Sequence, residues 1–148
     1  MPVLKDLAVL VVVSTPALAI AAPCVETAKT TAAVQCVEDH WQRGFMGGDS
    51  AFLGALLVDG YHSYSGDGTG HDKAAIVKAA SDYAKAHPNE PVTPPAMAPD
   101  IQLRGDVAVV FWKNADGSLS SVDAFAWDNG HWHAWYSQHA AAPAKKAT

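Results

Sequence analysis

Three glycine-containing dipeptides divide the last third of the chain into runs of alternating residues, and this feature constrains the fold most strongly. The dipeptides are Gly105-Asp106, Asp116-Gly117 and Asn129-Gly130. Such pairs favour tight hairpin turns between antiparallel strands. The pattern therefore predicts a four-stranded antiparallel meander, with strands at about residues 100–104, 107–114, 119–128 and 131–139.

The segment before this meander carries apolar residues at helical spacing. We expect one helix from about Thr31 to Met46, a short second helix capped by Asp49, and a third helix from about Asp72 to His87. A strand at residues 61–65 lies between the second and third helices. Five prolines within residues 88–99 exclude a helix or a central strand there. The fold class is therefore α+β, with the order α-α-β-α-β-β-β-β.

The first residues have the pattern of a secretory signal peptide. An apolar run at Leu7–Val13 precedes small residues at alternate positions, Ala17, Ala19 and Ala21, which is typical of a cleavage site. Pro16 and the shortness of the run oppose a membrane anchor. We expect residues 1–21 to be removed, leaving a leader at 22–32, one domain at 33–140 and a disordered tail at 141–148. The protein is then periplasmic or secreted, with no membrane contact after removal of the signal.

Composition excludes several classes of function. The chain has 148 residues, 49% hydrophobic content and a net charge of −5, without a basic cluster. These values indicate one acidic domain and exclude a nucleic-acid partner. The sequence contains no nucleophile elbow, zinc-protease motif, P-loop or dinucleotide fingerprint. We expect no cofactor and no metal ion.

The chain has two cysteines, Cys24 and Cys36. An exported protein experiences conditions that oxidise thiols. Inside one continuous helix the two Cα atoms would lie ~18 Å apart, which exceeds the span of a disulfide. The pair therefore forms a disulfide only if Cys24 lies on a leader that folds back beside the helix. Two free thiols are the alternative.

Several motifs resemble those of the nuclear transport factor 2-like (NTF2-like) superfamily, in particular its SnoaL-like and ketosteroid-isomerase-like branch. They arrive in the order expected of that family: Gly48-Asp49, Asp59-Gly60-Tyr61, Gly66-Asp67-Gly68 before Lys73, the run Gly105–Val110, Asn129-Gly130-His131-Trp132 and Ser137-Gln138-His139. The resemblance implies a cone-shaped fold of three N-terminal helices packed on a curved antiparallel sheet. It does not determine the activity, because related folds support unrelated functions.

Two-residue turns at the three dipeptides set the register of the meander. This register places Asp123 opposite Tyr136 and beside Val110, on the face that we expect to pack against the helices. The opposite face, which includes His133 and Trp135, is more apolar than a solvent-exposed face usually is. Members of the family commonly dimerise through that surface, so we expect a homodimer. His131 and His133 are close enough to chelate an ion together, but the sequence shows no third ligand.

Asp123 is the main candidate for catalysis. Apolar surroundings raise the pKa of a carboxyl, which then suits proton transfer next to a carbonyl group. Tyr136 and His62 are its expected partners. The alternative is a buried aspartate that only anchors a neighbouring group. The remaining residues expected to line the cone are His40, Trp41, Tyr64, Tyr83, Trp112, Trp127 and Gln138.

Two functions are consistent with these residues. The first is an exported protein that binds a small, mostly apolar molecule in the cone. The second is a cofactor-free isomerase, cyclase or dehydratase with Asp123 as general base. The sequence shows no clear second acid near Asp123, and this absence favours the binding function.

Overall fold

The computed structural model describes residues 24–92 and 98–141, which form three helices and a six-stranded sheet. The expected signal peptide lies outside the described residues, as do residues 142–148 of the expected tail. The helices and strands, in chain order, are α1 (Thr31–Gly47), α2 (Ser50–Leu56), β1 (Leu57–Tyr64), β2 (Gly70–Asp72), α3 (Lys73–Ala86), β3 (Asp100–Arg104), β4 (Val107–Lys113), β5 (Leu119–Asp128) and β6 (His131–His139).

Each helix begins at a side chain that accepts a hydrogen bond from the first turn. Thr30 caps α1, Asp49 caps α2 and Asp72 caps α3. Helix α1 ends at Gly48, whose φ of 70° is in the left-handed region that favours glycine. A Cβ atom at Gly48 would lie 2.8 Å from the Cβ of Ala84 in α3. This glycine therefore both ends α1 and lets α3 pack closely against it.

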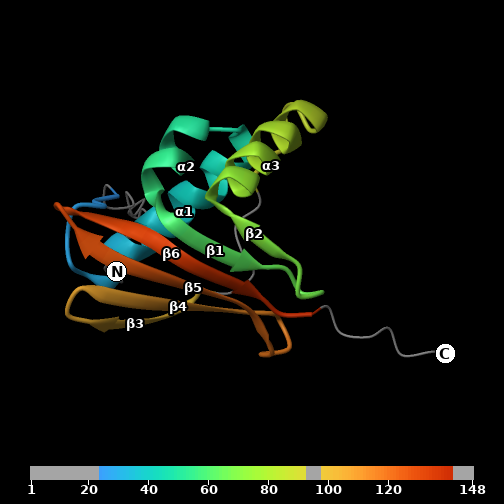
Figure 1. Ribbon diagram of the computed structural model, residues 1–148. Helices are drawn as coiled ribbons and strands as arrows, with labels where there is room; N and C mark the ends of the chain where they lie inside the picture. Colours follow the sequence, from blue (N-terminus) through green and yellow to red (C-terminus); the bar gives the residue numbers. More distant parts are fainter. Residues whose placement is uncertain (1–23, 93–97, 142–148) are drawn as a thin grey trace, which may run out of the picture.

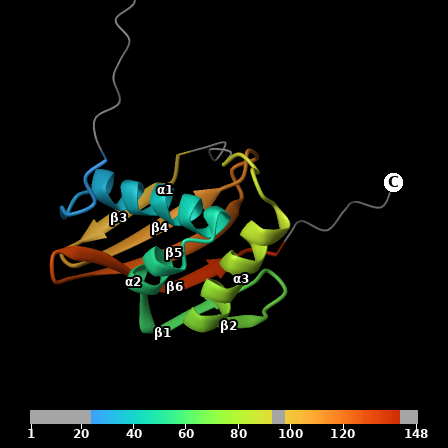
Figure 2. The same ribbon diagram turned by 90° about the horizontal axis from the view of Figure 1, so that it is seen from above.

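The strand order in the sheet is β2-β1-β6-β5-β4-β3. The three helices lie on the same side of this sheet (Figure 1). Seen from above, α1 runs along the β3–β5 half, whereas α2 and α3 lie over β6, β1 and β2 (Figure 2). The predicted fold class is correct. Two details differ, because β1 pairs in parallel with β6 and the short strand β2 was not expected.

Most of the predicted register is confirmed, but two parts are wrong. Beside the Asp116-Gly117 turn, Lys113 pairs with Leu119 instead of Ser120, which a two-residue turn would require. The turns pair Arg104 with Val107, Val110 with Asp123 and Asp128 with His131, as expected. Between the pairs Phe125–Ala134 and Ala124–Tyr136, however, β6 has one extra residue. Such a β-bulge shifts every later residue of the strand by one position. Asp123 consequently lies opposite Ser137 instead of Tyr136.

One end of the sheet, the packed end, is filled by apolar side chains. Phe125, Trp132 and Ala134 of the sheet are at most 3% exposed and pack in one cluster with Val34 and Val37 of α1. The indole nitrogen of Trp132 donates a hydrogen bond of 2.9 Å to the carbonyl oxygen of Ala28 in the leader. The leader therefore covers this end of the core.

A disulfide joins Cys24 to Cys36, with their Cα atoms 5.6 Å apart. Cys24 lies on the leader, which folds back along α1, so the geometric condition set by the sequence is met. Glu26 also contacts this helix through a 2.8 Å ion pair with His40. These two contacts and the Trp132 hydrogen bond attach the leader to the domain.

Candidate functional site

The other end of the sheet, the hollow end, contains a cavity of about 730 Å³ between the helices and the inner face of the sheet. Its rim is formed by exposed residues such as Lys113 and His139, and its floor by buried residues such as Ser121. The residues that line it are Glu38, Trp41, Gln42, Phe45, Met46, Tyr61, Ser63, Ile76, Tyr83, Trp112, Lys113, Asn114, Ala115, Ser120, Ser121, Asp123, Ser137 and His139.

Two carboxyl groups lie in this cavity. Asp123 of β5 is 6% exposed and Glu38 of α1 is 7% exposed. The hydroxyl of Ser137 donates a hydrogen bond to Asp123 Oδ1. Glu38 Oε1 has no hydrogen-bond partner among the residues that the structure describes. An acidic pair without a buried cation beside it is costly to ionise fully.

Burial raises the pKa of both carboxyls, and the pKa of Glu38 is raised further. Repulsion from Asp123 adds to the effect of burial on Glu38, while hydrogen bonding from Trp112 opposes it. For Asp123, the Ser137 hydroxyl and the positive charge of His139 lower the pKa and partly offset burial. Glu38 therefore retains its proton to higher pH than Asp123 does.

A tyrosine and two serines extend this polar floor. Tyr61 of β1 is 2% exposed and hydrogen-bonds with Ser63 and Ser137. Burial, together with the two carboxyls, raises the pKa of Tyr61 to about 12. Tyr61 is consequently a neutral phenol at physiological pH. The hollow end thus combines a protonatable pair with hydroxyl groups, whereas the packed end is apolar throughout.

Four of the residues expected in the cone line the cavity. Asp123 and Trp112 come from the meander, Trp41 from α1 and Tyr83 from α3. The Trp41 ring packs edge-on against Tyr61 and Phe125, with centroids 6.1 Å and 5.9 Å away. Trp41 therefore forms the boundary between the packed end and the hollow end.

Four other expected residues lie on the outer face of the sheet and do not line the cavity. Tyr136 follows the bulge and donates a 2.8 Å hydrogen bond to Gln138 Oε1 instead of facing Asp123. His62 is exposed and pairs with Tyr136 across the β1–β6 ladder. Tyr64 is 40% exposed and pairs with Gln138. Because residues alternate between faces, the one-residue shift moved Tyr136 and Gln138 outward together.

His40 and Trp127 also lie outside the cavity. The His40 ring stacks on Phe52 at 3.6 Å and bonds to Glu26 of the leader. Trp127 packs edge-on against Trp132 at the packed end, with Lys29 over its ring. Both residues stabilise the helix and leader packing, which explains their position without a ligand.

Sequence reasoning missed Glu38, the second acid. Glu38 lies four residues after Val34 and three before Trp41, so it shares the apolar face of α1. A carboxylate at such a position is rarely buried without a partner or a function, and this was the available signal. Ser137 and His139 were also missed, because the register without the bulge placed them on the outer face.

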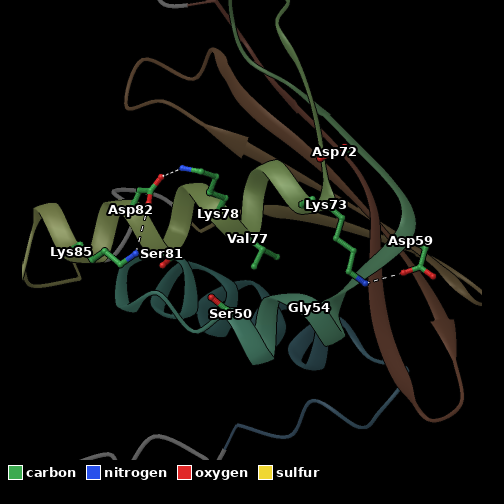
Figure 3. A pocket seen from close by; sticks show the side chains of 11 residues that line it. Ser50, Gly54, Asp59, Asp72, Lys73, Val77, Lys78, Ser81, Asp82 and Lys85 are labelled. Carbon is green, nitrogen blue, oxygen red and sulfur yellow. Dashed lines mark hydrogen bonds and ion pairs between the residues drawn. The ribbon is translucent and has the colours of Figure 1, made fainter.

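A second hollow lies on the surface between α2 and α3 and has a different character. The Lys73 Nζ atom lies 3.1 Å from Asp59 Oδ1. Figure 3 shows this ion pair and Asp82 between Lys78 and Lys85. Its charged residues thus form ion pairs with one another in contact with solvent. Such exposed pairs are worth little energetically, and the hollow has no buried polar floor.

Residues 24–92 and 98–141 contain neither a membrane-spanning helix nor a group of side chains arranged to bind a metal ion. No helix there has the length and apolar character needed to cross a membrane. No group of three or more histidine, cysteine, aspartate or glutamate side chains is arranged to hold a metal ion.

The fold has many solved counterparts. An NTF2-like protein from Cytophaga hutchinsonii superimposes with a TM-score of 0.58 at 16% identity, covering 74% of this chain and 95% of that one. An NTF2-like protein of unknown function from Silicibacter pomeroyi gives 0.57 at 18% identity, with 72% and 91% covered. A putative Ca/calmodulin-dependent kinase II association domain from Exiguobacterium sibiricum gives 0.55 at 15% identity, with 74% and 91% covered.

Comparison by sequence gave no match. No family model matches the chain, and no curated protein matches it. The structural likeness at this low identity establishes the fold and leaves the branch and the activity undetermined. We conclude that the chain has the NTF2-like fold.

Proposed function

We propose that the protein binds a small, mostly apolar molecule in the cavity of its hollow end. The cavity volume of about 730 Å³ is within the range typical of small-molecule sites. Trp41, Phe45 and Trp112 provide apolar walls, and the Glu38–Asp123 pair provides a polar floor. Such a combination fixes the orientation of a ligand while burying most of its surface. The buried floor beneath aromatic walls is the observation that carries the proposal.

Native mass spectrometry of the gently purified protein tests this proposal. We expect a co-purified small molecule that is released on denaturation. The variant Ser121→Phe fills the floor of the cavity and should lose the molecule. Val122→Phe adds the same ring on the opposite face of β5 and should keep it. A ligand retained equally by both variants would contradict binding in this cavity.

A cofactor-free proton-transfer enzyme is the second candidate, and Glu38 is the observation that favours it. An ionised Asp123 would take a proton from the carbon next to a substrate carbonyl, while a protonated Glu38 would donate a hydrogen bond to the resulting enolate oxygen. Return of the proton to another carbon completes an isomerisation. Two carboxyls with separated pKa values suit these two tasks.

Exchange of substrate hydrogen for deuterium, followed by NMR on a panel of cyclic ketones, tests the enzyme function. We expect Asp123→Asn to abolish exchange while leaving ligand affinity mostly unchanged. Asp39→Asn, an aspartate that does not line the cavity, is the control and should retain exchange. A lower melting temperature of Asp123→Asn without any exchange by the parent protein would indicate a structural aspartate.

We also propose that the protein is exported and forms a homodimer through the outer face of the sheet. Trp135 is 45% exposed and Val107 42% exposed on that face, and this exposure supports an interface. Light scattering should give a dimer that Trp135→Lys converts to a monomer. Sequencing the N-terminus of exported protein should give a start near residue 22.

A further inference from the structure

Within the part of the chain that the structure describes, no buried basic side chain lines the cavity beside its two carboxyls. Among the described residues that line the cavity, the basic side chains are Lys113 and His139, and both are exposed at the rim. Asp123 receives a hydrogen bond from Ser137, but Glu38 Oε1 is buried without a hydrogen-bond partner in residues 24–92 and 98–141. In folded proteins a buried acceptor of this kind usually has a donor. A ligand that enters the cavity can therefore supply a hydrogen-bond partner for this oxygen.

The walls above the carboxyls favour a positively charged group. The rings of Trp41, Tyr83 and Trp112 line the same cavity as Glu38 and Asp123. The faces of aromatic rings attract cations, and the attraction increases when the cation is removed from water. An ammonium or amidinium group at the floor would thus meet two acidic groups and nearby aromatic rings. A carboxylate ligand would meet repulsion at the same place.

We propose that the ligand of this cavity is an organic cation: an apolar body that carries one protonated amine or amidine, bound at the floor between Glu38 and Asp123. This inference rests on the proposed binding function and names the chemical class of its ligand. The nitrogen donates hydrogen bonds to Glu38 Oε1 and to the Asp123 carboxylate. The apolar body packs against Trp41 and Trp112.

Binding of an organic cation should release a proton from the protein, whereas binding of a neutral molecule should not. Glu38 gives up its proton to the buffer when the ammonium group arrives, because two carboxylates then share the positive charge. The other titratable groups around the pair are Asp39, Tyr61, Tyr83, Lys113 and His139. Tyr61 stays neutral below a pKa of about 12. Affinity for an amine should therefore increase as pH rises.

Isothermal titration calorimetry with three matched probes tests the inference: 2-phenylethylamine, 2-phenylethanol and phenylacetate. We expect the amine to bind at least about tenfold more tightly than the alcohol, which corresponds to one good charge-assisted contact. We expect phenylacetate to bind most weakly. Titrations in two buffers with different ionisation enthalpies should show proton release, and the amine affinity should rise as pH rises through the raised pKa of Glu38.

Two variants assign the preference to the carboxyl pair. Glu38→Gln should reduce amine affinity about tenfold and leave alcohol affinity unchanged. Asp39→Asn removes the same charge from the next residue, whose carboxylate accepts from Gln35 and does not line the cavity. Its repulsion is the smallest of the influences on the pKa of Glu38, so this variant should change amine affinity much less than Glu38→Gln does. Alcohol binding as tight as amine binding, or amine affinity unaffected by Glu38→Gln, overturns this inference alone. If no probe binds and no molecule co-purifies, both this inference and the proposed binding function are wrong.

Discussion

The packed end and the hollow end are built from the same strands and the same helix, yet one is solid and the other encloses a cavity. On β5 and β6 the packed end has Phe125 and Trp132, and the hollow end has Ser121 and Ser137. All four side chains are buried, so they differ in volume and polarity rather than in exposure. Large rings fill the space beneath α1 at one end, and small hydroxyl residues leave it open at the other. The difference shows that a few small polar residues on an otherwise apolar face are enough to leave a cavity with a polar floor.

Phe125→Ala should produce the largest effect, because it opens a hole in the packed end. Phe125 is fully buried, and loss of a buried phenylalanine typically costs about 3–5 kcal/mol. Ser121→Ala at the hollow end should change the free energy of unfolding by less than about 1 kcal/mol. Urea unfolding of both variants measures the contrast. Equal losses would mean that the two ends are packed alike.

Removal of the disulfide should have the second-largest effect on stability. Cys24→Ser together with Cys36→Ser should lower the free energy of unfolding by about 2–4 kcal/mol, because the leader is no longer held to α1. Since the leader covers the packed end, proteolysis should then cut near Ala28 first. Ligand binding by the folded variant should persist, because the leader does not line the cavity. Loss of binding without unfolding would contradict this separation of the two ends.

Glu38→Gln should stabilise the protein, but only above the ordinary titration range of glutamate. The pKa of Glu38 is raised in the folded state, so the folded protein binds the proton more tightly than the unfolded chain does. The associated stability is present below the unfolded-state pKa and is lost as pH rises from that value through the folded-state pKa. The variant avoids this loss, which amounts to ~1.4 kcal/mol for each unit of pKa difference. Melting temperatures of the variant and of the parent protein, taken from acidic to neutral pH, measure this loss of stability. Identical pH profiles would contradict the burial of Glu38.

Asp82→Asn should have the smallest effect. Asp82 forms ion pairs with Lys78 and Lys85 in the surface hollow of Figure 3, where water screens all three groups. We expect almost no change in the free energy of unfolding. A loss as large as that of a buried group would show that this hollow is more enclosed than its exposed side chains indicate.

Much of the fold was predictable because its signals are local. Turn dipeptides such as Asn129-Gly130 set strand boundaries and register, and caps such as Asp49 set helix starts. The bulge in β6 has no comparable signal, because it depends on how the sheet bends over the helices. The bulge turns Ser137 and His139 toward the inner face of the sheet and Tyr136 toward the outer face. The short strand β2 follows from its pairing with β1 and carries no alternation of its own.

The candidate site was only half predictable for a related reason. The bulge lies in β6, whereas Asp123 of β5 keeps the predicted pairing with Val110 of β4, so its position on the inner face was correct. Glu38 interrupts the apolar face of α1, but an isolated charge on a helix is usually exposed. Its burial becomes evident only when the small residues Ser121 and Ser137 are seen to leave space opposite it.

The central claim is that Glu38 and Asp123 form a buried pair in the hollow end. In this pair Glu38 keeps its proton to a higher pH than an ordinary glutamate does. A pH titration of the side-chain carboxyl carbons by ¹³C NMR measures this directly, with Asp123→Asn and Glu38→Gln used to assign the two signals. The account predicts that Glu38 titrates well above the ordinary glutamate range, and that its pKa falls when Asp123 becomes asparagine. Two carboxyls that titrate independently at ordinary acidic values would contradict it.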